Sequence, residues 1–401
     1  MKDDILYYCN FPTEIGNGEE GSISSKYKLT KVFTIIRHGD RFPIHSIPNH
    51  KYLTESCKAQ DNVQLKKKLP SFKNYTESMN KQVKLNLRNK GDSFKPFPIF
   101  PNDEFCGQAF LTPEGAAQHV EIGKLLNERY IKNHKLLDDQ YDNKVYAGNN
   151  SLCHQKSNHP CACKPLKEEA IMNLMASGVN QPANSYKHPK LYSVYKHMSN
   201  VFDVDASNLP PARQIMDTAM VQACHNEFLP SYKRDCINPV EFRKLVNFVN
   251  SHGKTKVNTN FWKVVSYLKM IPLLYEIASN MKEKTIEKFF LYSGHDSTID
   301  PLLTLLGVNT GIWPPYASRI IFEQYEYNER NYFRVLYNGK DVTRKIGFCK
   351  GKPLENDKLC SLETLWQFVN FQYLKELKCK SYRAACSIFS FKDNSLFRNF
   401  T

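Results

Sequence analysis

Two short apolar stretches of the chain are each followed at once by a run of polar and charged residues. The first stretch, Lys31–Ile36, is rich in β-branched side chains and has the continuous apolar character of a buried strand. The second, Phe289–Ser293, has the same character. Open α/β folds bind ligands at the carboxyl ends of their strands. We therefore predict that each polar run lies at the carboxyl edge of a sheet.

The sequence predicts two helices, one after each of the polar runs. Leu111–Gly115 predicts a helix start, because Thr112 can cap the first free amides and Pro113 is tolerated at the first helical position. Apolar residues within Ile299–Leu306 predict a second helix, which Gly307 would end.

The remaining segments are assigned mainly from their composition, because most show little regular periodicity. Two segments are expected to be mostly helical, 166–250 and 262–280. A long polar stretch, 49–105, has little periodicity and predicts an insertion. Residues 1–27 predict a weakly ordered leader, and residues 371–401 predict a C-terminal tail.

Size and charge restrict the class of protein. The 401 residues suffice for one large domain with a substantial insertion, and the 41% apolar content can bury a sizeable core. The net charge of +15 would suit a nucleic-acid binder, but no recognised binding motif accompanies it. Attraction of an anionic substrate, or of acidic glycans around it, explains the charge as well. The Lys66–Lys68 run is interpreted as a solvated face.

Cysteine usage indicates an oxidising compartment. The chain has 12 cysteines, many for a cytosolic enzyme, and glycosylation sequons at Asn74, Asn149 and Asn399 agree with this. About thirty mostly polar residues at the amino terminus lack the apolar core of a signal peptide. Either the chain is cytosolic with reduced thiols, or an upstream segment carrying a signal or anchor is missing. We favour the second, and no apolar run predicts a membrane span.

A turn-rich segment around residues 141–165 gathers potential zinc ligands. Its spacing matches no standard structural zinc pattern, so we expect disulfides rather than a metal there. Cys224 and Cys236 are interpreted as a local disulfide. The thiols and imidazoles of the segment are Cys153, Cys161, Cys163, His154 and His159.

Both polar runs have the chemistry of an anion site. In Arg37–Pro43 two guanidiniums bracket an imidazole, and Gly39 lets the backbone approach a ligand closely. In Gly294–Thr298, His295 and Asp296 precede a predicted helix, whose free amides favour an anion. Taken singly, a solvated loop and a capped helix start are the simpler interpretations.

The pattern Arg-His-Gly-x-Arg-x-Pro at 37–43 resembles the signature of the histidine acid phosphatases, branch 2 of the histidine phosphatase superfamily. The phrase Leu-Thr-Pro-x-Gly-x-x-Gln-His at 111–119 is a second resemblance, which makes His119 structural. The family implies an α/β, phosphoglycerate-mutase-like core, with a mostly parallel sheet flanked by helices and a largely helical insertion or cap. It implies one domain over 28–370, its core around 28–48, 106–150 and 260–370, with insertions around 49–105 and 151–259.

The resemblance also implies a mechanism and brings the two sheet edges together. His38 would be the nucleophile that forms a phosphohistidine. Arg37 and Arg41 would neutralise the phosphoryl oxygens, and His295 would add a donor. Asp296 would protonate the leaving alcohol and then activate water. No metal or other cofactor is required, because the arginines supply the positive charge.

The carboxyl-terminal third resembles the 2-phosphoxylose phosphatase branch of the family, at 316–323, 333–343 and the pair Cys349 and Cys360. The resemblance implies a Cys349–Cys360 disulfide. It implies removal of phosphate from xylose in the linker of proteoglycans, in the Golgi lumen. A basic protein also suits a phosphorylated sugar attached to acidic glycosaminoglycan chains.

The chain departs from the family pattern at a third phosphate-binding arginine. No arginine occurs between Arg129 and Arg213, and 145–151 is too short for the strand, arginine and helix expected there. Losing one donor to a transition state costs about 2.7–4 kcal/mol. Either an internal segment is missing, or the protein binds phosphosugar or acidic glycan without turnover. A basic polyanion-binding protein is a third hypothesis.

Overall fold

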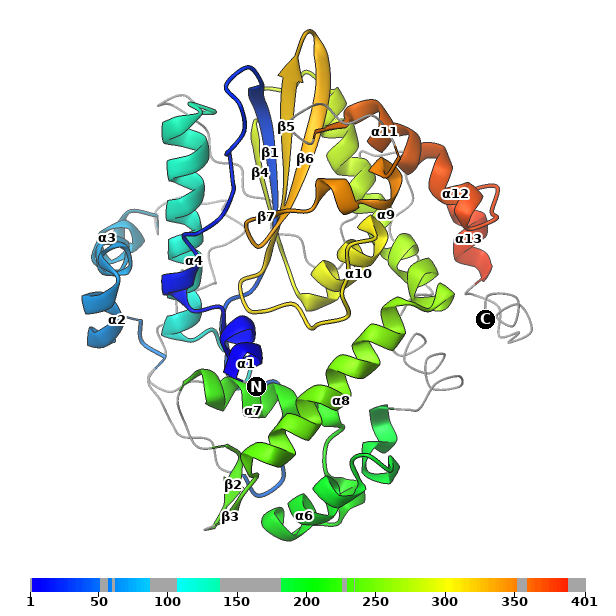
Figure 1. Cartoon of the computed structure of the whole chain (residues 1–401). Helices are drawn as coiled ribbons and strands as arrows, with labels where there is room; N and C mark the ends of the chain where they lie inside the picture. The colour runs from blue at the N-terminus through cyan, green and yellow to red at the C-terminus, as the bar shows by residue number, and fades with distance from the viewer. Residues whose placement is uncertain are drawn as a thin grey trace.

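A six-stranded sheet lies at the centre of the protein in the computed structural model (Figure 1). Its strands run in the order β4 (Phe289–Gly294), β1 (Lys28–Arg37), β5 (Arg319–Tyr327), β6 (Arg330–Tyr337) and β7 (Lys340–Asp341), and β8 (Cys360–Ser361) also pairs with β6. The structure describes residues 2–50, 57–59, 62–86, 107–137, 182–225, 229–233, 235–351 and 359–388.

Strand β1 lies inside the sheet because its side chains are apolar on both faces. Phe33 and Ile35 belong to one core cluster, and Val32 and Ile36 to another, as alternation along a strand requires. β1 pairs in parallel with β4 and antiparallel with β5. The predicted strands at 31–36 and 289–293 are confirmed as neighbours.

The expected α/β class, with helices flanking a sheet, is confirmed, and the described sheet is mixed. β5 and β6 form an antiparallel hairpin. Its turn residues Asn328 and Glu329 have φ values of 47° and 59°, the left-handed pair that a two-residue hairpin needs. Within the described residues, parallel pairing is confined to β1 and β4, the strands that precede the polar runs.

Helices cover both faces of the sheet and form a further layer beyond the carboxyl ends of β1 and β4 (Figure 1). One face carries α4, and the other carries α9, α10 and α11. Helices α6, α7 and α8 pack with α1 around a separate core, a helical cap. The bounds are α1 Lys2–Cys9, α2 Val63–Lys68, α3 Pro70–Asn86, α4 Pro113–Leu126, α6 Tyr192–Phe202, α7 Ala212–Cys224, α8 Pro239–Val257, α9 Asn260–Lys282, α10 Asp296–Leu306, α11 Leu362–Gln367, α12 Tyr373–Glu376 and α13 Tyr382–Ile388.

The predicted helix starts and stops are confirmed where the structure describes them. Thr112 caps α4 by accepting a hydrogen bond from the Gly115 amide at 3.1 Å. Gly307, with φ 75°, ends α10. Helices α6, α7 and α8 confirm the helical character of the described part of 166–250, and α9 confirms that of 262–280. The segment 49–105, expected to have little periodicity, contains α2 and α3.

The amino-terminal residues differ from the expected weakly ordered leader. Besides α1, they contribute a fully buried carboxylate: Glu20 pairs with Arg319, with an Nη2–Oε1 distance of 2.6 Å. The Gly21 amide donates to Glu323 at 2.7 Å, and Glu323 also pairs with Arg334 at 2.7 Å. We call residues 18–22 the N-terminal strap. Partners far along the chain order these residues, and local periodicity carries no sign of them.

The disulfides confirm one prediction and correct another. Cys349 and Cys360 are bonded, as the family resemblance implied. Cys224 bonds with Cys9 rather than with Cys236, which is free and exposed. The local pairing is wrong because the last residue of α7 lies against α1. The cysteines at 153, 161 and 163, and segment 145–151, lie outside the described residues. No helix among those described is long and apolar enough to cross a membrane.

Candidate active site

The two polar runs meet where β1 and β4 end. Arg37 stands opposite Gly294 in the parallel register, so His38 and His295 follow at the same level. Their ring centres are 5.5 Å apart. His295 is the N-cap of α10, which begins at Asp296. The predicted residues of both runs therefore lie at one edge of one sheet.

Arg37 is fully buried and only partly paired. Its Nη1 donates to the carbonyl of Pro314, whereas Nε and Nη2 have no hydrogen-bond partner among the described residues. Its guanidinium is 4.9 Å from the ring centre of Tyr316 and 5.8 Å from those of Tyr8 and Trp313. A buried guanidinium with two unpaired donors is suited to binding an oxyanion in a bidentate manner.

His38 is a neutral imidazole with one nitrogen available. Its Nδ1 lies 2.8 Å from the carbonyl oxygen of Gly39, which can only accept, so Nδ1 carries the proton. Burial, reinforced by the Arg37 charge, lowers the pKa of His38 to about 3. The imidazole therefore stays neutral at mildly acidic pH, and Nε2 keeps the lone pair that a nucleophile needs.

Asp296 is surrounded by donors. Its Oδ1 accepts from the Ser297 amide at 2.9 Å, and its Oδ2 accepts from Trp313 Nε1 at 2.7 Å and from Arg213 Nη2 at 2.9 Å. Burial alone would raise the pKa of this carboxyl. The charges of Arg37 and Arg213 and the Trp313 hydrogen bond outweigh burial and hold the pKa well below its ordinary value.

Arg41 lies at the same edge, but a carboxylate already holds it. Its Nη2 is 3.2 Å from Oδ2 of Asp217, and both side chains are buried. The Tyr8 hydroxyl donates to the same carboxylate at 3.1 Å. Arg41 Nε remains without a partner among the described residues. Arg41 therefore presents less free donor capacity than Arg37 does.

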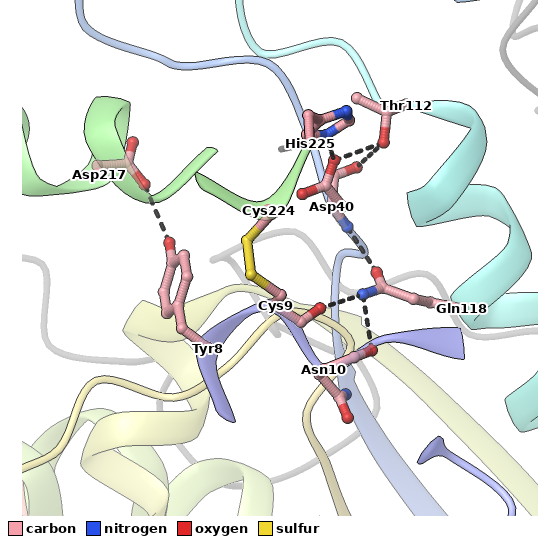
Figure 2. Close-up of a disulfide and its surroundings, with 9 residues drawn as sticks. All are labelled: Tyr8, Cys9, Asn10, Asp40, Thr112, Gln118, Asp217, Cys224 and His225. Carbon is pink, nitrogen blue, oxygen red and sulfur yellow. Dashed lines mark hydrogen bonds and ion pairs between the residues drawn. A yellow bond between two sulfur atoms is a disulfide. The ribbon is translucent and has the colours of Figure 1, made fainter. Parts of the chain in front are cut away.

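A buried network fixes the loop that follows His38 (Figure 2). Asp40 accepts from Thr112 Oγ1 at 2.6 Å and contacts His225 Nε2 at 2.7 Å. Gln118 accepts from the Asp40 amide at 2.7 Å and donates to the carbonyl of Cys9 at 2.7 Å. The network joins α4, the residue after α7 and the end of α1 to this loop. Preorganisation of this kind holds a reactive group in its productive geometry.

Several residues at this site carry no local signal in the sequence. They are Tyr8 from α1, Arg213 and Asp217 from the cap, and Trp313 from the loop before β5, and each resembles an ordinary core or surface residue where it stands. Within the described ranges, no group of three or more His, Cys, Asp or Glu side chains could hold a metal ion.

Comparison with known proteins identifies the family. A model of the histidine phosphatase superfamily (branch 2) matches residues 28–151 and 148–338. The chain belongs to this family. Two relatives, each named 2-phosphoxylose phosphatase 1, are 28% identical: that of Homo sapiens over 91% of this chain and 82% of its own length, and that of Xenopus tropicalis over 94% and 81%. The family and these relatives place the chain among the phosphoric monoester hydrolases.

A solved structure overlaps much of the chain at low similarity. The phytase from D. castellii is 13% identical, with a TM-score of 0.48, over 99% of this chain and 92% of its own. Such an overlap carries no argument about substrate or site.

Proposed function

We propose that this protein hydrolyses a phosphate monoester through a phosphohistidine at His38. One observation carries the proposal: an imidazole nitrogen with a free lone pair lies at the same sheet edge as a buried guanidinium, Arg37, that has two unpaired N–H donors. An anion held by those donors would face the nucleophile. Charge-assisted hydrogen bonds that strengthen as the transition state forms are a large source of catalysis.

The proposed reaction has two displacements at phosphorus. His38 Nε2 forms a bond to phosphorus while the bond to the ester oxygen breaks, and Asp296 gives a proton to the departing alcohol. Asp296 then takes a proton from water, whose oxygen attacks phosphorus and releases His38. Arg37, Arg41 and His295 supply positive charge and donors to the phosphoryl oxygens.

For the substrate, we propose the 2-phosphate of xylose in the linker of proteoglycans. The names of relatives that match over 91–94% of the chain support this. The net charge of +15 favours an acidic glycan partner. The Cys9–Cys224 and Cys349–Cys360 disulfides suit the Golgi or another lumenal compartment of the secretory pathway.

Two substrates and two variants test the proposal. The wild type is expected to release phosphate from a 2-phosphorylated xyloside of the linker and from p-nitrophenyl phosphate at acidic pH. His38→Ala is expected to lose roughly a thousandfold or more of kcat/KM. His252→Ala, whose ring packs on Phe248 in the cap, is the matched control and should retain full activity. Unchanged hydrolysis in His38→Ala would refute the mechanism, and inertness of the xyloside alone would refute the substrate.

Asp296→Asn tests the assignment of the acid. Loss of the proton donor should slow hydrolysis of the xyloside far more than that of p-nitrophenyl phosphate, because nitrophenolate leaves without protonation. Equal slowing of both substrates would contradict the assignment.

The non-catalytic alternative has its own outcome. A family member that binds phosphosugar without turnover would be protected from thermal unfolding by vanadate or phosphate, while neither substrate is hydrolysed. A polyanion-binding protein would instead bind heparin with a steep salt dependence that His38→Ala leaves unchanged.

A further inference from the structure

Arg213 connects the helical cap to the carboxylate at the end of the sheet. It is the second residue of α7, and its Nη2 lies 2.9 Å from Asp296 Oδ2. Its guanidinium is stacked 4.5 Å from the ring centre of Trp313, which donates to the same oxygen. The Arg213 side chain is 53% exposed, whereas that of Asp296 is 23% exposed. The ion pair is therefore reached from solvent on the arginine side.

The hydrogen-bond donors around Asp296 disfavour its protonated form, which a general acid requires. A protonated carboxyl must donate its own hydrogen, but Ser297, Trp313 and Arg213 present only N–H donors to it. The charged and titratable groups that act on Asp296 are Arg37 at the end of β1, His38 directly after it, Arg213 from α7 and Lys256 from α8. Asp296 can take up a proton readily only if one of the cations withdraws.

Arg213 is the cation that is free to withdraw. Arg37 is fully buried, and Lys256 is held by Asp300 at 2.6 Å. Arg213 is half exposed, and it pairs with Asp296 and stacks on Trp313. The neighbouring cation Lys256 repels it.

A bound phosphoryl group would give Arg213 a second partner. Arg37 offers two unpaired donors, enough for two of the three non-bridging oxygens, and Arg41 is held by Asp217. Arg213, which pairs with Asp296, is an additional guanidinium that suits the remaining negative charge, because arginine binds phosphate in a bidentate manner.

We propose that Arg213 is a two-position residue: it pairs with Asp296 in the empty site and moves onto the phosphoryl group of a bound substrate. This inference rests on the proposed function of the site. When Arg213 leaves, Asp296 takes a proton from solvent, and that proton later passes to the departing alcohol. Substrate binding thereby prepares the acid, and an empty site keeps Asp296 ionised.

Two measurements that need no turnover test this proposal. Calorimetry gives the affinity for inorganic phosphate. Fluorescence of Trp313 follows the titration of Asp296 in the ligand-free protein, with Trp313→Phe subtracted to remove the signal of the other tryptophans. Arg213→Ala should bind phosphate roughly tenfold more weakly. It should also raise the Asp296 titration midpoint by about one pH unit or more. Arg243→Ala, an exposed arginine of α8, is the matched control and should change neither.

The conservative variant separates charge from geometry. Arg213→Lys should restore most of the titration midpoint but not the phosphate affinity, because an ammonium cannot bind phosphate through a planar fork. A raised midpoint with unchanged phosphate affinity in Arg213→Ala would refute the movement onto phosphate. An unchanged midpoint would refute the pairing.

Failure of the proposed function gives a different result. Suppose that the wild-type protein hydrolyses neither substrate, while Arg213→Ala still weakens phosphate binding and raises the titration midpoint of Asp296. This result would overturn the proposed hydrolysis and uphold the role of Arg213. If the wild type hydrolyses the substrates but Arg213→Ala changes neither phosphate affinity nor the Asp296 midpoint, the proposed hydrolysis stands and the role of Arg213 is overturned. If both proposals hold, Arg213→Ala should also move the basic limb of the kcat/KM profile to higher pH, because that limb reports loss of the proton from Asp296. Replacing a purely structural residue would leave this limb where it is.

Discussion

Replacing the two cysteines of the Cys9–Cys224 disulfide with alanine is expected to destabilise the protein more than replacing Cys349 and Cys360. The first bridge spans 215 residues and the second spans 11. A cross-link removes entropy from the unfolded chain by about 2.1 + 1.5R ln n cal/mol/K. At 25 °C this gives about 5.4 kcal/mol for the longer loop and about 2.8 kcal/mol for the shorter. The expected difference of about 2.6 kcal/mol is an upper value, since any further bridge inside the longer loop reduces it.

Urea unfolding without reductant, followed by tryptophan fluorescence, measures this difference. Both double variants leave small buried sites, so the comparison depends mainly on loop length. Cys236→Ala removes a free, exposed thiol and is expected to stay within about 0.5 kcal/mol of the wild type. Equal destabilisation by the two double variants, or a larger effect of the shorter loop, would refute the entropic reasoning.

Phosphate binding gives a second readout for the same pair of variants. The Cys9–Cys224 bridge joins α1, which carries Tyr8, to α7, which carries Asp217 and Arg213. Without the bridge, α1 is no longer tied to α7, and the hydrogen bond from Tyr8 to Asp217 is expected to weaken. Because Asp217 positions Arg41, phosphate affinity should then fall. The Cys349–Cys360 variant should retain that affinity while it loses stability.

Three further predictions concern the site and its support. Gly39→Ala places a Cβ 2.4 Å from a backbone oxygen of α4 and should cost about 1–3 kcal/mol of unfolding free energy, whereas Gly123→Ala, with open space around it, should be neutral or stabilising; urea titration compares them. Because the pKa of His38 falls from 6.5 to about 3 on folding, the unfolded chain binds the extra proton between these values, and the stabilisation present above pH 6.5 is lost as the pH falls. His38→Gln should therefore lose less thermal stability than the wild type between pH 6 and pH 4, and equal loss would contradict the shift. Glu323→Gln breaks the buried pair with Arg334 and should cost about 3–5 kcal/mol in urea; a loss below about 1 kcal/mol would show that the pair is dispensable.

The sequence was informative where one short segment carried its own signal. The apolar run before His38 and the one before His295 predicted adjacent strands, because burial on both faces leaves an unbroken apolar pattern. Thr112 and Gly307 predicted helix ends, because capping depends on one or two residues.

Features made by distant segments could not be predicted in this way. Arg213 is a surface residue at a helix start by every local rule, and only the folded chain brings it to Asp296. The predicted pairing of Cys224 with Cys236 was wrong for the same reason, because Cys9, the true partner, lies far away in the sequence. Tyr8 lies on a short helix whose contacts, rather than its periodicity, determine its place.

Two contacts of the amino-terminal residues, that of Glu20 in the N-terminal strap and that of Cys9, can form only after distant partners have been synthesised. Glu20 pairs with a residue 299 positions later, so at about 5–20 residues per second it waits about 15–60 s for its partner to be made. Cys9 waits for Cys224 while five other cysteines are synthesised between them. Five incorrect partners are therefore available to Cys9 before Cys224 is synthesised. We expect efficient production to depend on a disulfide isomerase and on a chaperone that protects the early chain until β5 and β6 emerge.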